Sequence, residues 1–327
     1  MEKMLVSSSP HIRSGRTTSG IMTDVCIALF PSLICSVIFF GVRALLLTAL
    51  CVFFSIGFEF LWQKLTKSPI TISDGTAAVT GMLLAFNLPV LAPWWICLVG
   101  SFVAIIIAKQ FFGGTGHNFI NPALAGRAFL LASWPVIMTR WTLPFTTGLF
   151  IPVDVVSSAT PLSILKESSG AELPRILDMF LGNTGGCLGE TSALALILGG
   201  IYLVARGVIS LRIPLTYIGT VALLSFIFPN ANLSAQDSVL VNILSGGLML
   251  GAFFMATDYV TSPVTKKGQI IMGLGCGILT FVIRRFGGYP EGVSYSILLM
   301  NFVTPLIDKY TKPKPFGSQR QMKGGNK

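Results

Sequence analysis

The hydrophobic pattern consists of apolar runs separated by shorter polar segments along nearly the whole chain. A helix needs about 20 mainly apolar residues to cross the hydrocarbon core of a bilayer. Hydrophobic residues make up 52% of the chain and charged residues only 11%, far fewer than in a soluble domain. We therefore predict an all-α polytopic membrane protein. Its ten spans are expected at residues 21–42, 43–63, 76–88, 93–112, 121–138, 190–206, 212–229, 240–257, 268–286 and 290–308.

The third and eighth spans are weaker than the others. The third, TAAVTGMLLAFNLP, is short, and the eighth is interrupted by Gly246, Gly247 and Gly251. These spans hold matching places in two groups of five, and an odd number of crossings inverts the second group. Broken spans at matching places indicate a site between inverted repeats. The pattern predicts two inverted five-helix repeats, residues 21–138 and 190–308.

The basic residues decide the expected orientation. If the N-terminus is inside, most of the 23 lysines and arginines lie on the inner side. The positive-inside rule then places both termini, residues 1–20 and 309–327, in the cytoplasm and the 139–189 loop outside. We expect a protein of the cytoplasmic (inner) membrane whose charges contact anionic lipid. Binding to nucleic acid is not expected.

The cysteines show no pattern of metal ligation. No C-x-x-C pair occurs, and no histidine lies at ligand spacing from a cysteine. Buried cysteines commonly act as small hydrophobic residues. We predict no metal site from Cys26, Cys35, Cys51, Cys97, Cys187 and Cys276.

The 139–189 loop contains the stretch DVVSSAT, which matches the pattern D-x-x-[S/T]-[S/G]-A-[T/S]. This pattern resembles the site at which a flavin transferase attaches FMN to a threonine through a phosphoester. Small residues before Thr160 leave room for that enzyme, and Pro161 favours an extended backbone that presents the hydroxyl. The same residues also fit an unmodified Ser/Thr turn. The candidate FMN-binding residues are Asp154, Ser157, Ser158, Ala159 and Thr160.

Longer stretches carry a family resemblance that runs in order from about residue 9 to residue 310. They are SPHIRSGRTTSGIMTDVCIALFP, SDGTAAVTGMLLAFNLP, GGTGHNFINPALAGRAF, GNTGGCLGETSALALILGGIYL and ATDYVTSPVTKKGQ. Together they resemble the D subunit of the Rnf complex, the ion-translocating ferredoxin:NAD oxidoreductase. The chain is more distantly similar to the B subunit of the sodium-translocating NADH:quinone oxidoreductase.

The resemblance implies ten helices in inverted repeats and a covalent FMN on the acceptor threonine, which matches Thr160. Ser158 stands where family members often have glycine. The resemblance also implies membrane and peripheral partner subunits that complete an electron path, and a flavin transferase for maturation. For some relatives it implies a second, noncovalent flavin such as riboflavin.

The stretch GNTGGCLGET precedes the sixth span and lies on the same expected side as Thr160. Gly185 and Gly186 permit a backbone nest at a helix N-terminus, which suits the FMN phosphate. The alternative is a flexible loop in which Glu190 or Thr191 caps the helix.

Several acidic residues lie near the expected cytoplasmic ends of spans. Charge is costly in a bilayer, so Asp24, Asp74 and Asp258 are candidates for ion coupling. In that interpretation the repeat symmetry brings Asp74 and Asp258 together. The alternative is helix capping and snorkelling, with Glu59 one turn from Gln63.

Two further function classes compete with a redox subunit. An inverted repeat and the single tripeptide Asn121-Pro122-Ala123 suggest a channel or transporter for a small neutral solute. A cap followed by a first-turn proline explains that tripeptide equally well. A structural scaffold is the third class, and fold alone does not decide among the three.

Overall fold

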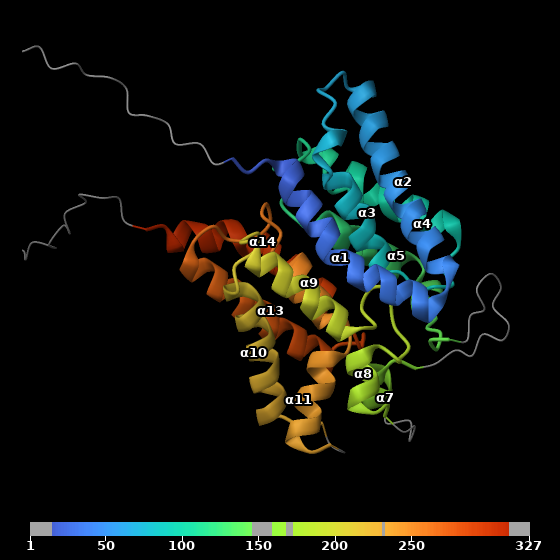
Figure 1. Ribbon diagram of the computed structural model, residues 1–327. Helices are drawn as coiled ribbons and strands as arrows, with labels where there is room; N and C mark the ends of the chain where they lie inside the picture. Colours follow the sequence, from blue (N-terminus) through green and yellow to red (C-terminus); the bar gives the residue numbers. More distant parts are fainter. Residues whose placement is uncertain (1–14, 146–158, 168–172, 231–232, 314–327) are drawn as a thin grey trace, which may run out of the picture.

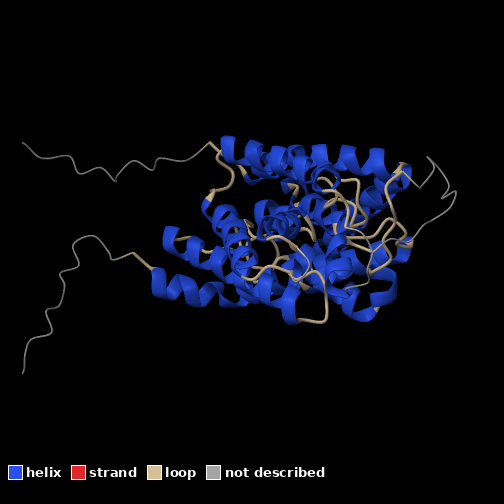
Figure 2. Cartoon of the chain, turned by 90° about the horizontal axis from the view of Figure 1, so that it is seen from below, coloured by secondary structure: helices blue, strands red, loops and turns tan. Residues whose placement is uncertain are grey.

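A computed structural model describes residues 15–145, 159–167, 173–230 and 233–313 of the chain. Throughout these ranges the secondary structure is helical, and Figure 2 shows helices joined by loops without a strand. The prediction of an all-α fold is confirmed for the described part of the chain.

The helices fall into an early and a late group along the chain. The early group comprises α1 (Thr18–Phe40), α2 (Val42–Leu65), η1 (Ile72–Asp74), α3 (Thr76–Phe86), α4 (Trp94–Phe102), η2 (Val103–Ile107), η3 (Gln110–Phe112), α5 (Pro122–Ser133) and α6 (Pro135–Met138). The late group comprises α7 (Pro161–Glu167), α8 (Ile176–Leu181), α9 (Ala193–Ala205), α10 (Arg212–Ile227), α11 (Ala235–Leu244), α12 (Leu248–Leu250), η4 (Gly251–Met255), α13 (Lys266–Phe286) and α14 (Val293–Thr311). Figure 1 shows the two groups on either side of the molecule, blue to green and yellow to red, and α1 packs against α9 between them.

Several of these helices are long and apolar enough to cross a membrane. By length and composition four of the described helices qualify: α1, α2, the continuous Trp94–Phe112 segment and α13. A fifth span results if Ala235–Leu244 and Leu248–Met255, which meet at 62°, are counted as one. The shorter apolar helices include α3, α9 and α10. The structure supports a multi-pass membrane protein, whereas ten crossings and the inverted repeat stay predictions.

Helix α1 exposes large apolar side chains and buries two serines beside its buried apolar residues. Its buried residues include Ser32 and Ser36, while Phe30, Ile34 and Ile38 are exposed. Small polar residues allow close helix packing in a bilayer, and large apolar side chains suit contact with lipid. The composition of α1 therefore follows from a hydrocarbon environment.

The break predicted in the eighth span lies between α11 and α12. Gly246 and Gly247 have φ angles of 68° and 67°, a left-handed conformation that residues with a side chain rarely adopt. Gly251 lies instead within the helix that continues after the break. The first two glycines therefore make the bend, and the third allows Val293 to pack closely.

The contact between α1 and α9 depends on a glycine. A methyl group at Gly199 would overlap the carbonyl oxygen of Ala28, which belongs to the backbone of α1. We expect Gly199→Ala to destabilise the protein by about 1–3 kcal/mol, because overpacking forces the two helices apart. Thermal unfolding in detergent measures this loss. Gly219→Ala in α10 is the matched control, since a methyl group there meets nothing within 4 Å. Equal unfolding midpoints for the two variants would contradict the prediction.

Candidate functional site

Thr160 lies directly before α7 and caps it. Its hydroxyl accepts a hydrogen bond from the backbone N–H of Ser163 at 3.2 Å and donates one to the Ser163 hydroxyl, also at 3.2 Å. Pro161 is the first helical residue, as is common in helices. Only 5% of Thr160 is exposed, so the openly presented hydroxyl expected from the sequence is not what the structure shows. Its role as flavin acceptor stays a prediction.

Of the other residues in the expected acceptor motif, the structure describes only Ala159. Ala159 is exposed at the surface of the molecule. Asp154, Ser157 and Ser158 lie outside the described residues.

A basic cavity of about 180 Å³ adjoins α7. Its charged lining residues are Lys166 of α7 and Arg284 and Arg285 of α13, all of them cationic. Lys166 also donates a hydrogen bond to the backbone carbonyl of Gly287. Three basic groups around one polar space suit an anion such as a phosphate. The sequence reasoning missed this cavity, because its lining residues are far apart in the chain.

The loop at residues 182–191 is folded into the bundle. The backbone N–H of Leu188 donates to the carbonyl of Leu88, and that of Gly189 donates to the carbonyl of Phe86, both at 3.0 Å. These bonds join the loop to the end of α3 and the residues that follow it. Whether this loop is flexible, as the alternative interpretation expects, stays a prediction.

The residues of the predicted phosphate nest lie inside the molecule, and the cap of the helix that follows is a third residue. Gly185 and Gly186 are both buried. The N-terminus of α9 is capped by Ser192, whose hydroxyl accepts from the N–H of Ala195, rather than by Glu190 or Thr191. The phosphate role of Gly185 and Gly186 stays a prediction.

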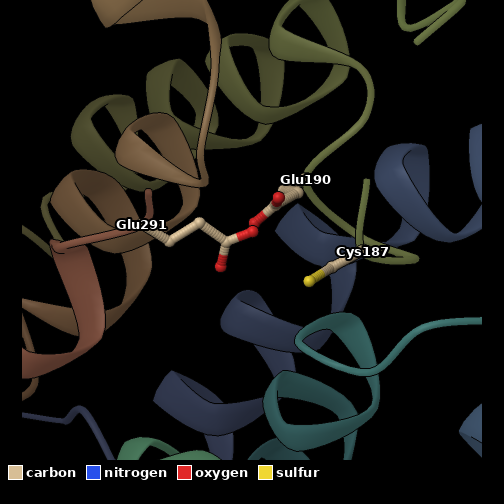
Figure 3. A group of neighbouring side chains, drawn as sticks. All are labelled: Cys187, Glu190 and Glu291. Atoms are coloured by element: carbon tan, nitrogen blue, oxygen red, sulfur yellow. The ribbon is translucent and has the colours of Figure 1, made fainter. Parts of the chain in front are cut away.

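A charged cluster lies behind this loop. Arg127 of α5 is 5% exposed, donates to the Asn87 side-chain oxygen and forms an ion pair with Glu291. The carboxylate of Glu190 lies 4.0 Å from the same guanidinium. Burial, and next the negative charge of Glu291, raise the pKa of the Glu190 carboxyl, which lies in the loop before α9. Figure 3 shows the Glu190 and Glu291 side chains pointing toward one another, with the Cys187 thiol nearby.

Two of the candidate ion-coupling residues have ordinary structural partners. Asp24 accepts from the Tyr202 hydroxyl at 3.0 Å and pairs with Arg206 at 3.3 Å. Asp74 accepts from the N–H and the hydroxyl of Thr76 at 2.8 and 2.7 Å, and so caps the start of α3. These contacts fit the capping interpretation.

Asp258 accepts a hydrogen bond from the Thr261 hydroxyl at 3.1 Å and also lies at a cavity. It lines a cavity of about 280 Å³ together with Lys109, and burial raises the pKa of its carboxyl. Thr76 and Thr115, the two hydroxyl partners of Asp74, line the same cavity. Asp258 and the hydroxyl partners of Asp74 thus line one cavity, whereas Asp74 itself does not line it. An ion-coupling role for either residue stays a prediction.

A buried ion pair adjoins this cavity and was missed from the sequence. Glu59 is fully buried, and the ammonium of Lys109 lies 2.9 and 3.0 Å from its two oxygens. Lys109 also donates to the Thr76 hydroxyl at 2.7 Å, and the Gln110 amide donates to Glu59 at 3.0 Å. Gln63, the expected neighbour, contributes only a 3.4 Å contact. Glu59 is therefore a packed ion-pair partner rather than a snorkelling residue.

Comparison with known proteins gives a match over nearly the whole chain. The family model described as the NQR2, RnfD, RnfE family matches residues 5–317. One relative, from Acetobacterium woodii, is named as the D subunit of a Na(+)-translocating ferredoxin:NAD(+) oxidoreductase complex. It is 55% identical over 96% of this chain and 95% of its own length.

Other relatives match over the same extent. The D subunit of the proton-translocating ferredoxin:NAD(+) oxidoreductase complex of Clostridium ljungdahlii is 47% identical over 96% of each chain. The D subunit of the ion-translocating oxidoreductase complex of Escherichia fergusonii is 37% identical over 96% of this chain and 99% of its own. The similarity therefore covers both groups of helices and the segment between them.

The Glu59–Lys109 pair gives a test of the buried network. We expect Lys109→Met to cost about 3–5 kcal/mol of stability, because it leaves the Glu59 carboxylate buried without a cation. The double variant Glu59→Gln/Lys109→Met removes both charges and should recover most of that loss. Lys64→Met, at an exposed lysine of α2, is the control and should change little. Unfolding midpoints in detergent measure all three. A double variant no more stable than Lys109→Met would rule out the pair as the cause.

Proposed function

The chain belongs to the NQR2, RnfD, RnfE family, and we propose that it is a membrane subunit of an ion-translocating ferredoxin:NAD⁺ oxidoreductase complex. The observation that carries this proposal is the similarity to subunits of such complexes across both helix groups. Other membrane and peripheral subunits of the complex are the proposed partners. The apolar exposed face of α1 supports its place in a bilayer.

A solute channel has less support. Its sequence evidence was the tripeptide beginning at Asn121, and the side chain of that residue accepts from the Leu124 N–H at 3.3 Å as a helix cap. Pro122 occupies the first position of α5. The tripeptide thus has a structural explanation that needs no pore.

We further propose that Thr160 carries FMN through a phosphoester on its hydroxyl. The bound FMN would accept and donate the electrons, while the protein supplies position and charge. The support is the basic cavity beside α7, where Lys166, Arg284 and Arg285 would offset the charge of a phosphate. Arg284 is 8% exposed and anchored by backbone carbonyls, so its charge is held in place.

The buried hydroxyl of Thr160 sets a condition on maturation. A flavin transferase must reach an oxygen that caps α7, a helix of only seven residues. Helices this short are marginally stable on their own. We propose that α7 opens at its N-terminus during flavin transfer, before its docking against the bundle is complete.

A second, noncovalent flavin such as riboflavin is part of the same proposal. The surface that lines the cavity of about 280 Å³ is mainly apolar. Polar side chains, among them Lys109 and Asn121, interrupt it. Small-molecule sites commonly have this composition. This cavity is where a noncovalent aromatic ligand should be sought first.

Covalent flavin can be tested on the isolated chain coexpressed with a flavin transferase. After denaturing electrophoresis the wild-type band should fluoresce under illumination, because a phosphoester to FMN survives unfolding. Thr160→Ala should abolish the fluorescence, whereas Thr139→Ala, at an exposed threonine of the same segment, should keep it. A dark wild-type band would instead support a flavin-free channel or scaffold.

The proposed topology has its own test. A reporter enzyme that works only outside the cytoplasm should be active when inserted within the 139–189 loop. The same reporter should be inactive when fused after residue 313, because the basic segments hold both termini inside. The opposite pattern of activities would mean that the proposed orientation is inverted.

A further inference from the structure

The Glu190–Glu291 pair has fewer cationic partners than its charge requires. Glu190 lies in the loop before α9, and Glu291 precedes α14, so the fold brings them together from distant parts of the chain. Their ligand oxygens and the Cys187 sulfur all lie within 4.8 Å of one another. Their side chains are 5% and 13% exposed. Two carboxylates this close and this buried disfavour simultaneous ionisation.

One guanidinium serves both acids. Arg127 directs its two terminal nitrogens at Glu291 and at the Asn87 side chain, and its nearest approach to Glu190 is 4.0 Å. A separation of 4.0 Å is beyond hydrogen-bond distance. Arg127 therefore neutralises Glu291 and leaves Glu190 with a weaker, longer contact.

The second arginine in the region directs both terminal nitrogens at backbone carbonyls, while its buried Nε has no hydrogen-bond partner. Arg284 donates to the backbone carbonyls of Asn242 at 2.6 Å, Ser245 at 3.0 Å and Gly246 at 3.3 Å. Those carbonyls belong to the end of α11 and the bend that follows it. Arg284 thus hydrogen-bonds to the carbonyl end of that helix, and it acts on the two carboxylates through its charge alone.

Each acid retains one oxygen without a hydrogen bond. Among the described residues, Oε2 of Glu190 and Oε1 of Glu291 are buried polar atoms that lack a partner. Leaving buried polar atoms unsatisfied costs about 1–3 kcal/mol each. The two carboxyl groups point toward one another in Figure 3, so a proton held between them would give the pair a hydrogen bond.

We infer that Glu190 and Glu291 together bind one exchangeable proton, carried as a neutral carboxyl on Glu190 that donates to the Glu291 carboxylate. Arg127 balances the remaining negative charge on Glu291. The inference goes beyond the proposed function and does not rest on a flavin at Thr160.

The other groups that face the pair favour a proton over a metal ion. The Cys187 thiol lies 3.4 Å from the backbone carbonyl of Asn87, and burial raises the pKa of this thiol, which favours the neutral form. The Tyr295 side chain on α14 interacts with Arg127, and a phenol is neutral at physiological pH. A metal cation would lie beside the Arg127 guanidinium and be repelled by it, whereas a proton adds no separate centre of charge.

Infrared spectroscopy of the full chain in detergent tests the inference. A protonated carboxylic acid gives a carbonyl band that shifts in heavy water and disappears when the acid ionises. We expect wild-type protein at neutral pH to have such a band and to lose it as the pH rises. The Glu190→Gln variant should lack the intensity that the Glu190 carboxyl contributes to this band. Glu59→Gln should keep the full band, because the Glu59 carboxylate is paired with the Lys109 ammonium and not with a second acid. If Glu59→Gln does not fold, Asp24→Asn serves as the control.

Unfolding midpoints give a second readout that distinguishes the two acids. Glu190→Gln should keep the wild-type midpoint, because the amide N–H donates to Glu291 as the carboxyl does. Glu291→Gln should lower it, because Arg127 loses its anion. A band of equal intensity in wild type and Glu190→Gln, or a Glu190→Gln protein that fails to fold, would overturn the inference. Repeating the spectra in Thr160→Ala, which carries no flavin if the proposed function is right, separates the two proposals.

Discussion

A charge inside an apolar helix bundle must find a partner, because desolvation is costly and no water is at hand to compensate. The described structure meets this constraint with contacts between distant segments. Lys109, near the end of the Trp94–Phe112 segment, pairs with Glu59 of α2. Arg127 of α5 pairs with Glu291, which lies in the loop before α14. The second pair links the early and the late helix group, so it fixes their relative position as well as satisfying its own charges.

The position of most helices follows from the sequence, because apolar runs and breakers act locally. The first span was predicted at residues 21–42, and α1 occupies Thr18–Phe40. The break at Gly246 and Gly247 was likewise predicted, because glycine weakens a helix, although the consecutive Gly199 and Gly200 do not break α9. Local reasoning works here because each signal depends on only a few neighbouring residues.

The functional contacts were less predictable, because they join residues that are far apart in the chain. The sequence analysis related Glu59 to its neighbour Gln63. In the structure Glu59 forms its ion pair with Lys109, which lies in a different segment of the chain. The pairing of the 182–191 loop with the end of α3 has no local signal, and neither has the basic cavity beside α7. Thr160 was identified from its motif and the family resemblance, but its burial was not foreseen, because it depends on how α7 docks.

The central claim is that Thr160 holds a redox group on a short helix docked against fixed positive charge. Digestion at Arg140 and Lys166 would release one peptide containing Thr160 and a few other hydroxyl residues, and fragment-ion mass spectrometry can assign a modification among them. For peptide from the assembled, electron-transferring complex, the account predicts the added mass of a flavin phosphoryl group on residue 160. An unmodified residue 160 in a complex that still transfers electrons would contradict it.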